Sequence, residues 1–318
     1  MKHLLAITCA CFFILSSNAQ ELSFEQQKEL AEHWAPIHYQ SIRKTDSPFN
    51  SNSLKGKSDS LSTMDFDNDW IATNNWENLR KYDSDPAVYY YVAATSTHYF
   101  ITYGYFHPRD WTRFNLFHLG QHENDLEGAL FVVERDSSKW GKLLIGYSVF
   151  HLSLKRNFYC EDDSIFHSSS ERYLPGLIEQ GHPVSYQQPR GHGVKLEPSF
   201  HKPNRSYCRY IPAILNESDD HDKKYRLINL LDSNQLIHQR NNENFFNDDQ
   251  TIKGSKGEGA NPPWLWRDWS DSKKKLDIQL FTDPANYILI DNVFSLHYST
   301  EYTHHPYLNT IKFDNQTP

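Results

Sequence analysis

The sequence is poor in cysteine, lacks an excess of basic residues and contains no apolar run long enough to cross a membrane. Its 4 Cys form no CxxC pair and no Cys/His spacing typical of zinc. No stretch approaches the roughly 18 apolar residues of a membrane-spanning helix, so no transmembrane helix is expected. A formal charge of -8 argues against a nucleic-acid partner held by a general basic field.

Several enzyme motifs are also incomplete. His122-Glu123 would begin a metalloprotease HExxH motif, but Leu126 stands where the second His is needed. Gly56-Lys57-Ser58 resembles the end of a phosphate-binding loop, but the first glycine is missing, and no GxSxG nucleophile elbow occurs. A nucleotide-binding GxGxxG fails after Gly257-Glu258-Gly259. These absences exclude the commonest hydrolase and nucleotide-binding signatures.

The start of the chain has the pattern of an export signal. Residues 4–15 are apolar, and Ser17-Asn18-Ala19 supplies the small residues that a signal peptidase reads. We predict a signal peptide over residues 1–19, a secreted or periplasmic protein, and a single domain over residues 20–318. Cys160 and Cys208 then remain, and two cysteines in an exported chain predict a disulfide; two buried thiols are the alternative.

Aromatic residues are abundant, at 14% of the chain, while the mean hydropathy is -0.72, which indicates an aromatic core within long polar loops. Residues 23–34 predict a helix, with Ser23 as N-cap and Gln26 completing a capping box. β-Branched and aromatic runs predict four hairpin strands and a last strand. These strands are residues 88–93, 98–106, 128–134, 142–154 and 287–297. Residues 227–237 fit helix or strand equally. The expected fold is therefore an antiparallel β-sandwich with long loops and a few short helices.

The segment from Asp110 to Glu127 concentrates potential metal ligands. If a strand begins near Asp125, then Asp125 and Glu127 point to one face, and His122 can fold back onto it. Converging carboxylates are costly unless a cation or protons neutralise them. The sequence therefore predicts a divalent-cation site at Asp110, His122, Asp125 and Glu127, with Ca²⁺ or Mg²⁺ favoured and Mn²⁺ allowed. The alternative is a network of ion pairs with Arg109, Arg113 or Arg135.

Other residues offer weaker signals. His151 fits a packed core histidine or a group facing the cation site, and His192 lies between glycines that permit close approach to a ligand. Residues 65–69 alternate acids like a calcium loop but lack its glycine and closing Glu, so a solvated turn is preferred. Trp264 and Trp266 follow two prolines and are expected to be buried rather than to face a membrane or sugar.

The run GQHENDLE, residues 120–127, resembles the Gly-His-Arg-His-Asp-Trp-Glu heptapeptide of the necrosis-inducing, NPP1-like secreted proteins. A related signature occurs in a vacuolar-protein-sorting-associated family. The shared core is His-x-x-Asp-x-Glu, kept here as His122, Asp125 and Glu127, whereas Asn124 and Leu126 replace a His and a Trp. The resemblance implies a β-sandwich with a cation held in a cleft, where it helps to dock a lipid headgroup.

Two functions follow as hypotheses. In the first, the protein binds a lipid or glycan headgroup through its cation and contacts a membrane peripherally. In the second, it is a secreted hydrolase of a small-molecule substrate, with Glu127 or His151 as base and His192 holding the substrate. A structural metal without a ligand-binding role is a third alternative.

Overall fold

The computed structural model describes most of the chain between residues 21 and 307. The described residues are 21–42, 54, 56–111, 121–150, 153–159, 175–197, 206–216, 219–257, 259–266, 280–290 and 298–307. The predicted signal peptide, His151, Cys160 and Arg113 lie outside them, so the signal peptide and the disulfide stay predictions. Cys208 is buried and has no disulfide partner among the described residues.

The predicted hairpin strands are confirmed, except that the predicted strand 142–154 divides into two paired strands, and together they form the longest ladder among the described residues. Its strands are β2 (Ala87–Thr95), β3 (His98–Asp110), β4 (His122–Glu134), β5 (Lys142–Phe150) and β6 (Ser153–Phe158). Each neighbouring pair is antiparallel, as expected for strands joined by short turns. The β4 strand begins at His122, so the whole predicted ligand motif lies within regular structure rather than before it.

The remaining strands overturn the antiparallel sandwich. They are β1 (Ile37–Ile42), β7 (Ile178–Glu179), β8 (His182–Gln187), β9 (Val194–Lys195), β10 (Ser206–Pro212), β11 (Lys223–Asn229) and β12 (Tyr302–His304). All strands join one 12-stranded sheet with the order β6-β5-β4-β3-β2-β11-β10-β1-β8-β7, to which β12 and β9 are added. Three of its pairs, β1·β8, β10·β11 and β11·β2, are parallel.

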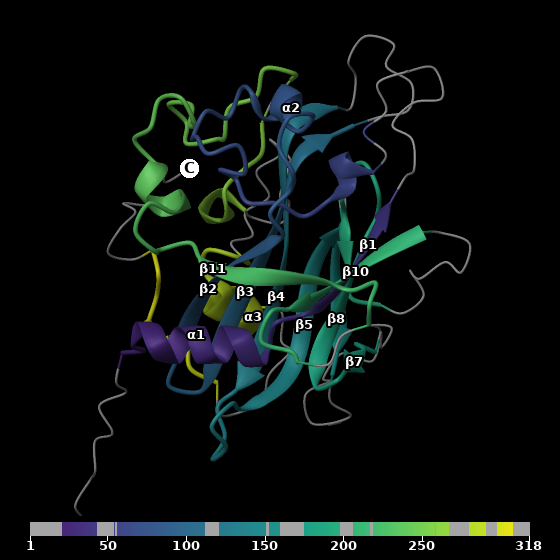
Figure 1. Ribbon diagram of the computed structural model, residues 1–318. Coiled ribbons are helices and arrows are strands. Elements are labelled where there is room, and N and C mark those ends of the chain that lie inside the picture. Colours follow the sequence, from purple (N-terminus) through teal and green to yellow (C-terminus); the bar gives the residue numbers. More distant parts are fainter. Residues whose placement is uncertain are drawn as a thin grey trace, which may run out of the picture.

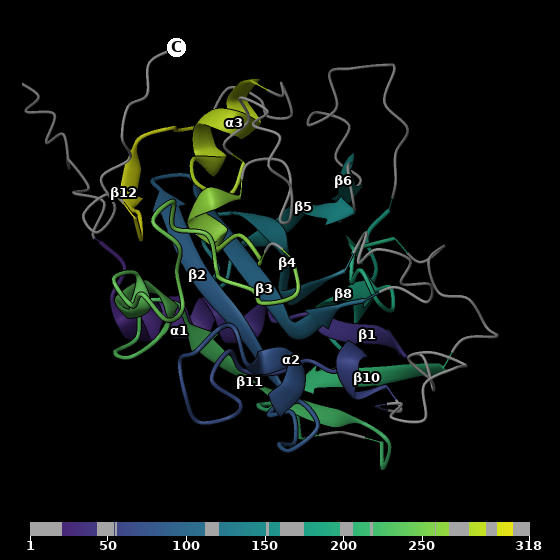
Figure 2. The ribbon, with the colours of Figure 1, turned by 90° about the horizontal axis from the view of Figure 1, so that it is seen from above.

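This mixed sheet curls into a nearly closed, barrel-like form (Figures 1 and 2). Its far end returns through β9, which packs against β4 and β5, and Leu196 just after β9 contacts Gly146 of β5. The sheet thus curves back on itself instead of forming two separate layers. The sandwich prediction is wrong because parallel pairing between remote segments leaves no periodic signal in either segment.

Two cores lie on opposite faces of the β3–β4 ladder. The first core gathers Leu126, Leu130 and Val132 with Trp264 and Trp266, which are buried as expected. Gly104 and Gly128 are opposite each other on β3 and β4, and a β-carbon on Gly128 would lie 2.2 Å from the ring of Trp266. The missing side chain is therefore what admits that ring.

The second core lies on the other face of the ladder. It includes Ala129, Phe131 and Val133 of β4, and it packs against α1 (Phe24–His33) through Leu30. The predicted capping box is confirmed: Ser23 Oγ accepts from Gln26 N–H at 3.2 Å, and Gln26 Oε1 accepts from Ser23 N–H at 2.9 Å.

Two expectations near the end of the chain are settled differently. Residues 227–237 divide between β11 and a 3₁₀ turn, η4 (Leu236–Gln239). Residues 287–290, the first part of the predicted last strand, belong instead to the helix α3 (Pro284–Ile290). Residues 291–297 lie outside the described part. Among the described residues, no helix has both the length and the apolar composition needed to span a membrane.

Candidate functional site

The predicted ligands lie at one end of the β3–β4 ladder. Asp110 is opposite His122, and the next donors, Asp125 and Glu127, are opposite His107 and Tyr105. Asp125 and Glu127 are almost completely buried, whereas the side chains of Asp110 and His122 keep 13% and 17% of their surface exposed. The ladder therefore arranges an outer pair of donors and a buried pair.

Asn124 separates the outer pair from the buried pair. Its φ of 62° lies in the left-handed region, which Asn tolerates better than most residues. The side-chain amide of Asn124 donates to the carbonyls of Ala72 and Lys253 at 2.7 and 2.8 Å, and its Oδ1 accepts from Asn75 at 2.7 Å. Where the resembling heptapeptide has a second His, this chain thus has a residue that joins two loops.

The outer pair is formed by two acceptor atoms that face each other. Nδ1 of His122 lies 2.8 Å from the carbonyl oxygen of Asn124, so it carries a proton. Nε2 then faces Oδ2 of Asp110 at 3.5 Å. A second proton or a cation between these atoms relieves the repulsion. Two ligands of one cation lie roughly 3–3.5 Å apart when each bond is about 2.1–2.5 Å, so this spacing suits a cation.

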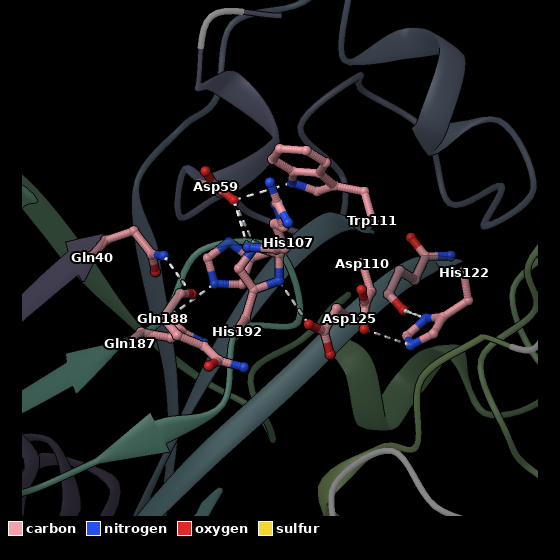
Figure 3. A network of polar contacts seen from close by, with 12 residues as sticks. Gln40, Asp59, His107, Asp110, Trp111, His122, Asp125, Gln187, Gln188 and His192 are labelled. Carbon is pink, nitrogen blue, oxygen red and sulfur yellow. Dashed lines mark hydrogen bonds and ion pairs between the residues drawn. The ribbon is translucent and has the colours of Figure 1, made fainter. Parts of the chain in front are cut away.

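Asp125 instead belongs to a buried triad with His192 and Asp59. Its Oδ2 accepts from Nδ1 of His192 at 2.7 Å, and Nε2 of His192 lies 3.4 Å from Oδ1 of Asp59 (Figure 3). The ring of His192 is fully buried. Burial lowers the pKa of His192, but the hydrogen bonds and charges of Asp125 and Asp59 outweigh it and raise the pKa to about 9. The ring is therefore a cation at neutral pH.

The turn that carries His192 is held in an unusual backbone conformation. Arg190 and His192 have φ values of 80° and 42° on either side of Gly191. Asp59, at the end of η1 (Lys57–Asp59), accepts from the backbone N–H of Arg190 at 2.9 Å and from Trp111 Nε1 at 3.1 Å. Strained backbone of this kind persists where the surroundings fix it, and it is found preferentially at functional sites.

A neutral histidine stacks on the cationic one. The rings of His107 and His192 are 3.8 Å apart and nearly parallel, at 10°. Burial, reinforced by the charge of His192, holds the pKa of His107 well below its ordinary value. Nδ1 of His107 faces the carbonyl of Ser60 at 3.1 Å and is therefore protonated, which leaves Nε2 as an acceptor. This tautomer offers a neutral ring to the imidazolium.

Gln187 connects this stack to β1. Its Oε1 lies 2.9 Å from Nε2 of His107 and 3.1 Å from Nε2 of His38, while its amide nitrogen is buried without a partner. When the oxygen and nitrogen positions of the Gln187 amide are exchanged, its NH₂ group donates to Nε2 of His107. Burial lowers the pKa of His38 to about 3, against the opposing hydrogen bonds of Gln40 and Gln187. The inner end of the sheet is thus a continuous polar network.

The fit of a cation to these residues is partial. Among the described residues, no group of three or more His, Cys, Asp or Glu is arranged to hold a metal ion. His192 uses its two ring nitrogens on opposite sides, so Asp59 and Asp125 do not converge on one point. Oδ1 of Asp125, however, is buried with no hydrogen-bond partner. A cation bound by Asp110 and His122 would need this oxygen to turn toward it.

The other predicted site residues have different surroundings. The guanidinium of Arg109 donates to the carbonyl of Trp76 and lies 4.4 Å over the Trp76 ring. Arg135 donates to the carbonyl of Thr95 at 2.7 Å, at the far end of the ladder from the donors. Two histidines also face carboxylates here: His122 lies opposite Asp110, and His192 lies between Asp125 and Asp59.

The ring of His192 is not accessible to a substrate, which a catalytic residue requires. Its Asp125 hydrogen bond resembles that of a general base, but its other nitrogen faces Asp59 and no part of the ring is exposed. Asp59 itself has no motif that identifies it in the sequence. In the acidic turn of residues 65–69, Asp67 and Asp69 accept hydrogen bonds from neighbouring amides, among them Asn78 at 2.7 Å and Asn74 at 3.1 Å.

Comparison with known proteins gives similar folds at low identity. No family model and no curated protein matches the chain. NLPPya in complex with mannosamine is 13% identical, covers 87% of this chain and 94% of that chain, and has a TM-score of 0.40. The non-toxic HaNLP3 protein is 14% identical, covers 66% and 76%, and has a TM-score of 0.33.

A third similar structure is Necrosis and Ethylene inducing Protein 2 from the causal agent of cocoa's Witches Broom disease. It is 12% identical, covers 63% of this chain and 73% of that chain, and has a TM-score of 0.31. Proteins of the necrosis-inducing type are thus found among the similar folds, and nothing found bears on the vacuolar-protein-sorting-associated family. At these TM-scores the likeness carries no argument about function.

Proposed function

We propose that this protein binds a divalent cation at the Asp110 end of the β3–β4 ladder and, through it, the headgroup of a lipid or glycan. Asp110 and His122 supply the first ligands, and Asp125 and Glu127 complete the set. The observation that carries the proposal is the buried, unpartnered Oδ1 of Asp125. Such an acceptor costs free energy until a cation, a proton or water satisfies it.

The convergence of His122 Nε2 and Asp110 Oδ2 supports the same conclusion. These atoms lie at a spacing that one cation can bridge, and both side chains keep some contact with solvent. A cation bound there would retain open coordination positions on its solvent side. Hydroxyl and phosphate oxygens of a headgroup suit hard cations such as Ca²⁺ and Mg²⁺. A peripheral contact with a membrane follows if that headgroup belongs to a lipid.

The test is calorimetric titration of the chelator-treated protein with Ca²⁺, Mg²⁺ and Mn²⁺. Asp110→Asn is the principal variant because its partly exposed side chain makes unfolding an unlikely cause of lost binding. Asp220→Asn, at an exposed acid, is the control with the same change of charge. Saturable binding in the wild type and the control, weakened at least ten-fold by Asp110→Asn, is the expected result. Equal binding by all three proteins would contradict the site.

Glucosamine and mannosamine are the first headgroup probes. Two of the similar structures are NLPPya in complex with glucosamine and NLPPya in complex with mannosamine. The expected result is sugar binding in the presence of the cation and none after chelation. Binding of the cation with a raised melting temperature, but with no sugar or lipid headgroup bound, would instead identify a structural metal.

A further inference from the structure

A short segment lies flat against the beginning of β4. We define Lys253–Gly257 as the flap. A β-carbon on Gly257 would lie 2.9 Å from the carbonyl oxygen of Gln121 and 3.4 Å from Cβ of His122, and the φ of Gly257 is 106°. A β-carbon on Gly254 would lie 3.1 Å from the carbonyl of Glu123. Glycine at both positions is what lets the flap approach β4 this closely.

Ser255 attaches the middle of the flap to a buried carboxylate. Its backbone N–H and its hydroxyl both donate to Oε2 of Glu123, at 2.7 and 2.6 Å. Glu123 is fully buried, and its other oxygen accepts from the N–H of Trp76 at 2.7 Å. Hydrogen bonds to a charged acceptor are the strong class, so Ser255 is the principal attachment.

Lys256 supplies a second, weaker attachment on the surface. Its ammonium lies 3.1 Å from Oε1 of Glu77, next to Trp76, and both side chains are substantially exposed. Exposed pairs of this kind contribute little. The beginning of the flap is also fixed, because the amide of Asn124 donates to the carbonyl of Lys253.

We propose that the flap covers His122, the residue opposite Asp110, and that Ser255 and Lys256 hold it closed. Residues Glu123 and Asn124, which lie inside the predicted ligand motif, are positioning residues that retain the flap rather than ligands. Release of Ser255 exposes His122 and leaves Glu123 without two of its donors, so the closed position is the stable one. The consequence for ligand access rests on the proposed function, whereas the covering of His122 does not.

The test measures how fast diethyl pyrocarbonate modifies His122, followed by peptide mass spectrometry on the full-length protein. Ser255→Ala is expected to increase the rate about ten-fold, because the hydroxyl donates to a charged group. Lys256→Ala is expected to increase it about two-fold, as for an exposed ion pair. Lys139→Ala is the matched control, since it breaks an exposed 3.1 Å pair with Glu29 far from the flap.

His192 serves as the internal standard because it is fully buried and stays unreactive while the protein is folded. If Ser255→Ala makes His192 reactive as well, the variant has unfolded, and Lys256→Ala then decides the question. Equal rates at His122 in the wild type and the folded variants would overturn the flap. Faster modification in these variants establishes the flap even if calorimetry finds no cation, in which case only the proposed function fails.

Discussion

At the Asp110 end of the β3–β4 ladder, the two faces of the sheet carry opposite kinds of residue, although each face is apolar further along. On one face, Leu126 and Leu130 pack with Trp266 in the first core. On the other, Asp125 and Glu127 are equally buried, and Asp125 faces His192. The apolar face can be repacked by any side chain of suitable volume, whereas the polar face depends on the position of single atoms. The polar chemistry is therefore concentrated on the second face, at the Asp110 end of the ladder.

The largest effect is expected from breaking the triad on the polar face. Asp125→Ala leaves the His192 cation buried with one carboxylate fewer, which should lower the free energy of unfolding by about 4 kcal/mol. Urea denaturation at pH 7 measures it. Adding His192→Leu removes the stranded charge and should restore part of the loss. Strictly additive effects of the two substitutions would show that these residues are not coupled.

On the apolar face, the comparison is between two glycines that touch the same ring. Gly128→Ala places a methyl group 2.2 Å from Trp266 and 2.9 Å from a backbone oxygen, and should destabilise by about 3 kcal/mol. Gly104→Ala meets nothing closer than 3.5 Å and should change stability by less than about 1 kcal/mol. Thermal unfolding of both variants measures the two losses of stability. Similar losses in Gly128→Ala and Gly104→Ala would contradict the packing of Trp266 against Gly128.

The polar face should also respond to acid, through His38. Its pKa falls from 6.5 to about 3 on folding, so the unfolded chain takes up a proton that the folded chain refuses. The stability that the neutral ring contributes is complete above pH 6.5 and is lost as the pH falls toward 3. Each pH unit below 6.5 lowers the free energy of unfolding by about 1.4 kcal/mol, which gives a loss of about 2 kcal/mol between pH 7 and pH 5.

His38→Gln should flatten this part of the curve of stability against pH, because Gln does not titrate. The measurement is the free energy of unfolding in urea from pH 7 to pH 5. A variant that keeps the wild-type slope would assign the acid sensitivity to other groups.

The smallest effect concerns the helix that covers the second core. Ser23→Ala removes the N-cap and should lower stability by about 1 kcal/mol. Lys28→Ala breaks an exposed 3.9 Å pair with Glu32 and should change it by less than about 0.5 kcal/mol. Denaturant titration of both variants is the measurement. A larger loss from Lys28→Ala would show that the helix depends on its exposed face rather than on its cap.

The features predictable from the sequence are those that depend on neighbouring residues. The Ser23–Gln26 capping box and the hairpins follow from residues a few positions apart, and the expected burial of Trp264 and Trp266 is confirmed. The His122–Glu127 run is recognised for the same reason, because its potential ligands lie within six consecutive positions.

The contacts that the sequence does not predict join remote segments of the chain. Asp125 meets His192 across 67 positions, and Asp59 comes from a turn with no distinguishing pattern. The role of Glu123 has no signal in the sequence, because only the structure shows Ser255 and Trp76 donating to it. The parallel strand pairs also join remote segments, so the sequence does not indicate them. The predicted sandwich is wrong for this reason.

The pairing of β2 has a consequence for the time course of folding. This strand forms a hairpin with β3 within a few residues, but its other partners are β11, where Arg226 is opposite Ala87, and β12, where Tyr302 is opposite Thr95. Contacts between such distant segments require long loops to close, and the chain loses conformational entropy before the contacts stabilise it. These pairs therefore form slowly and late. The hairpins can assemble while the chain is still emerging, but the sheet stays divided until the segment of β11 arrives to join β2 to β10. A chain truncated before that segment should therefore expose unpaired strand edges and aggregate.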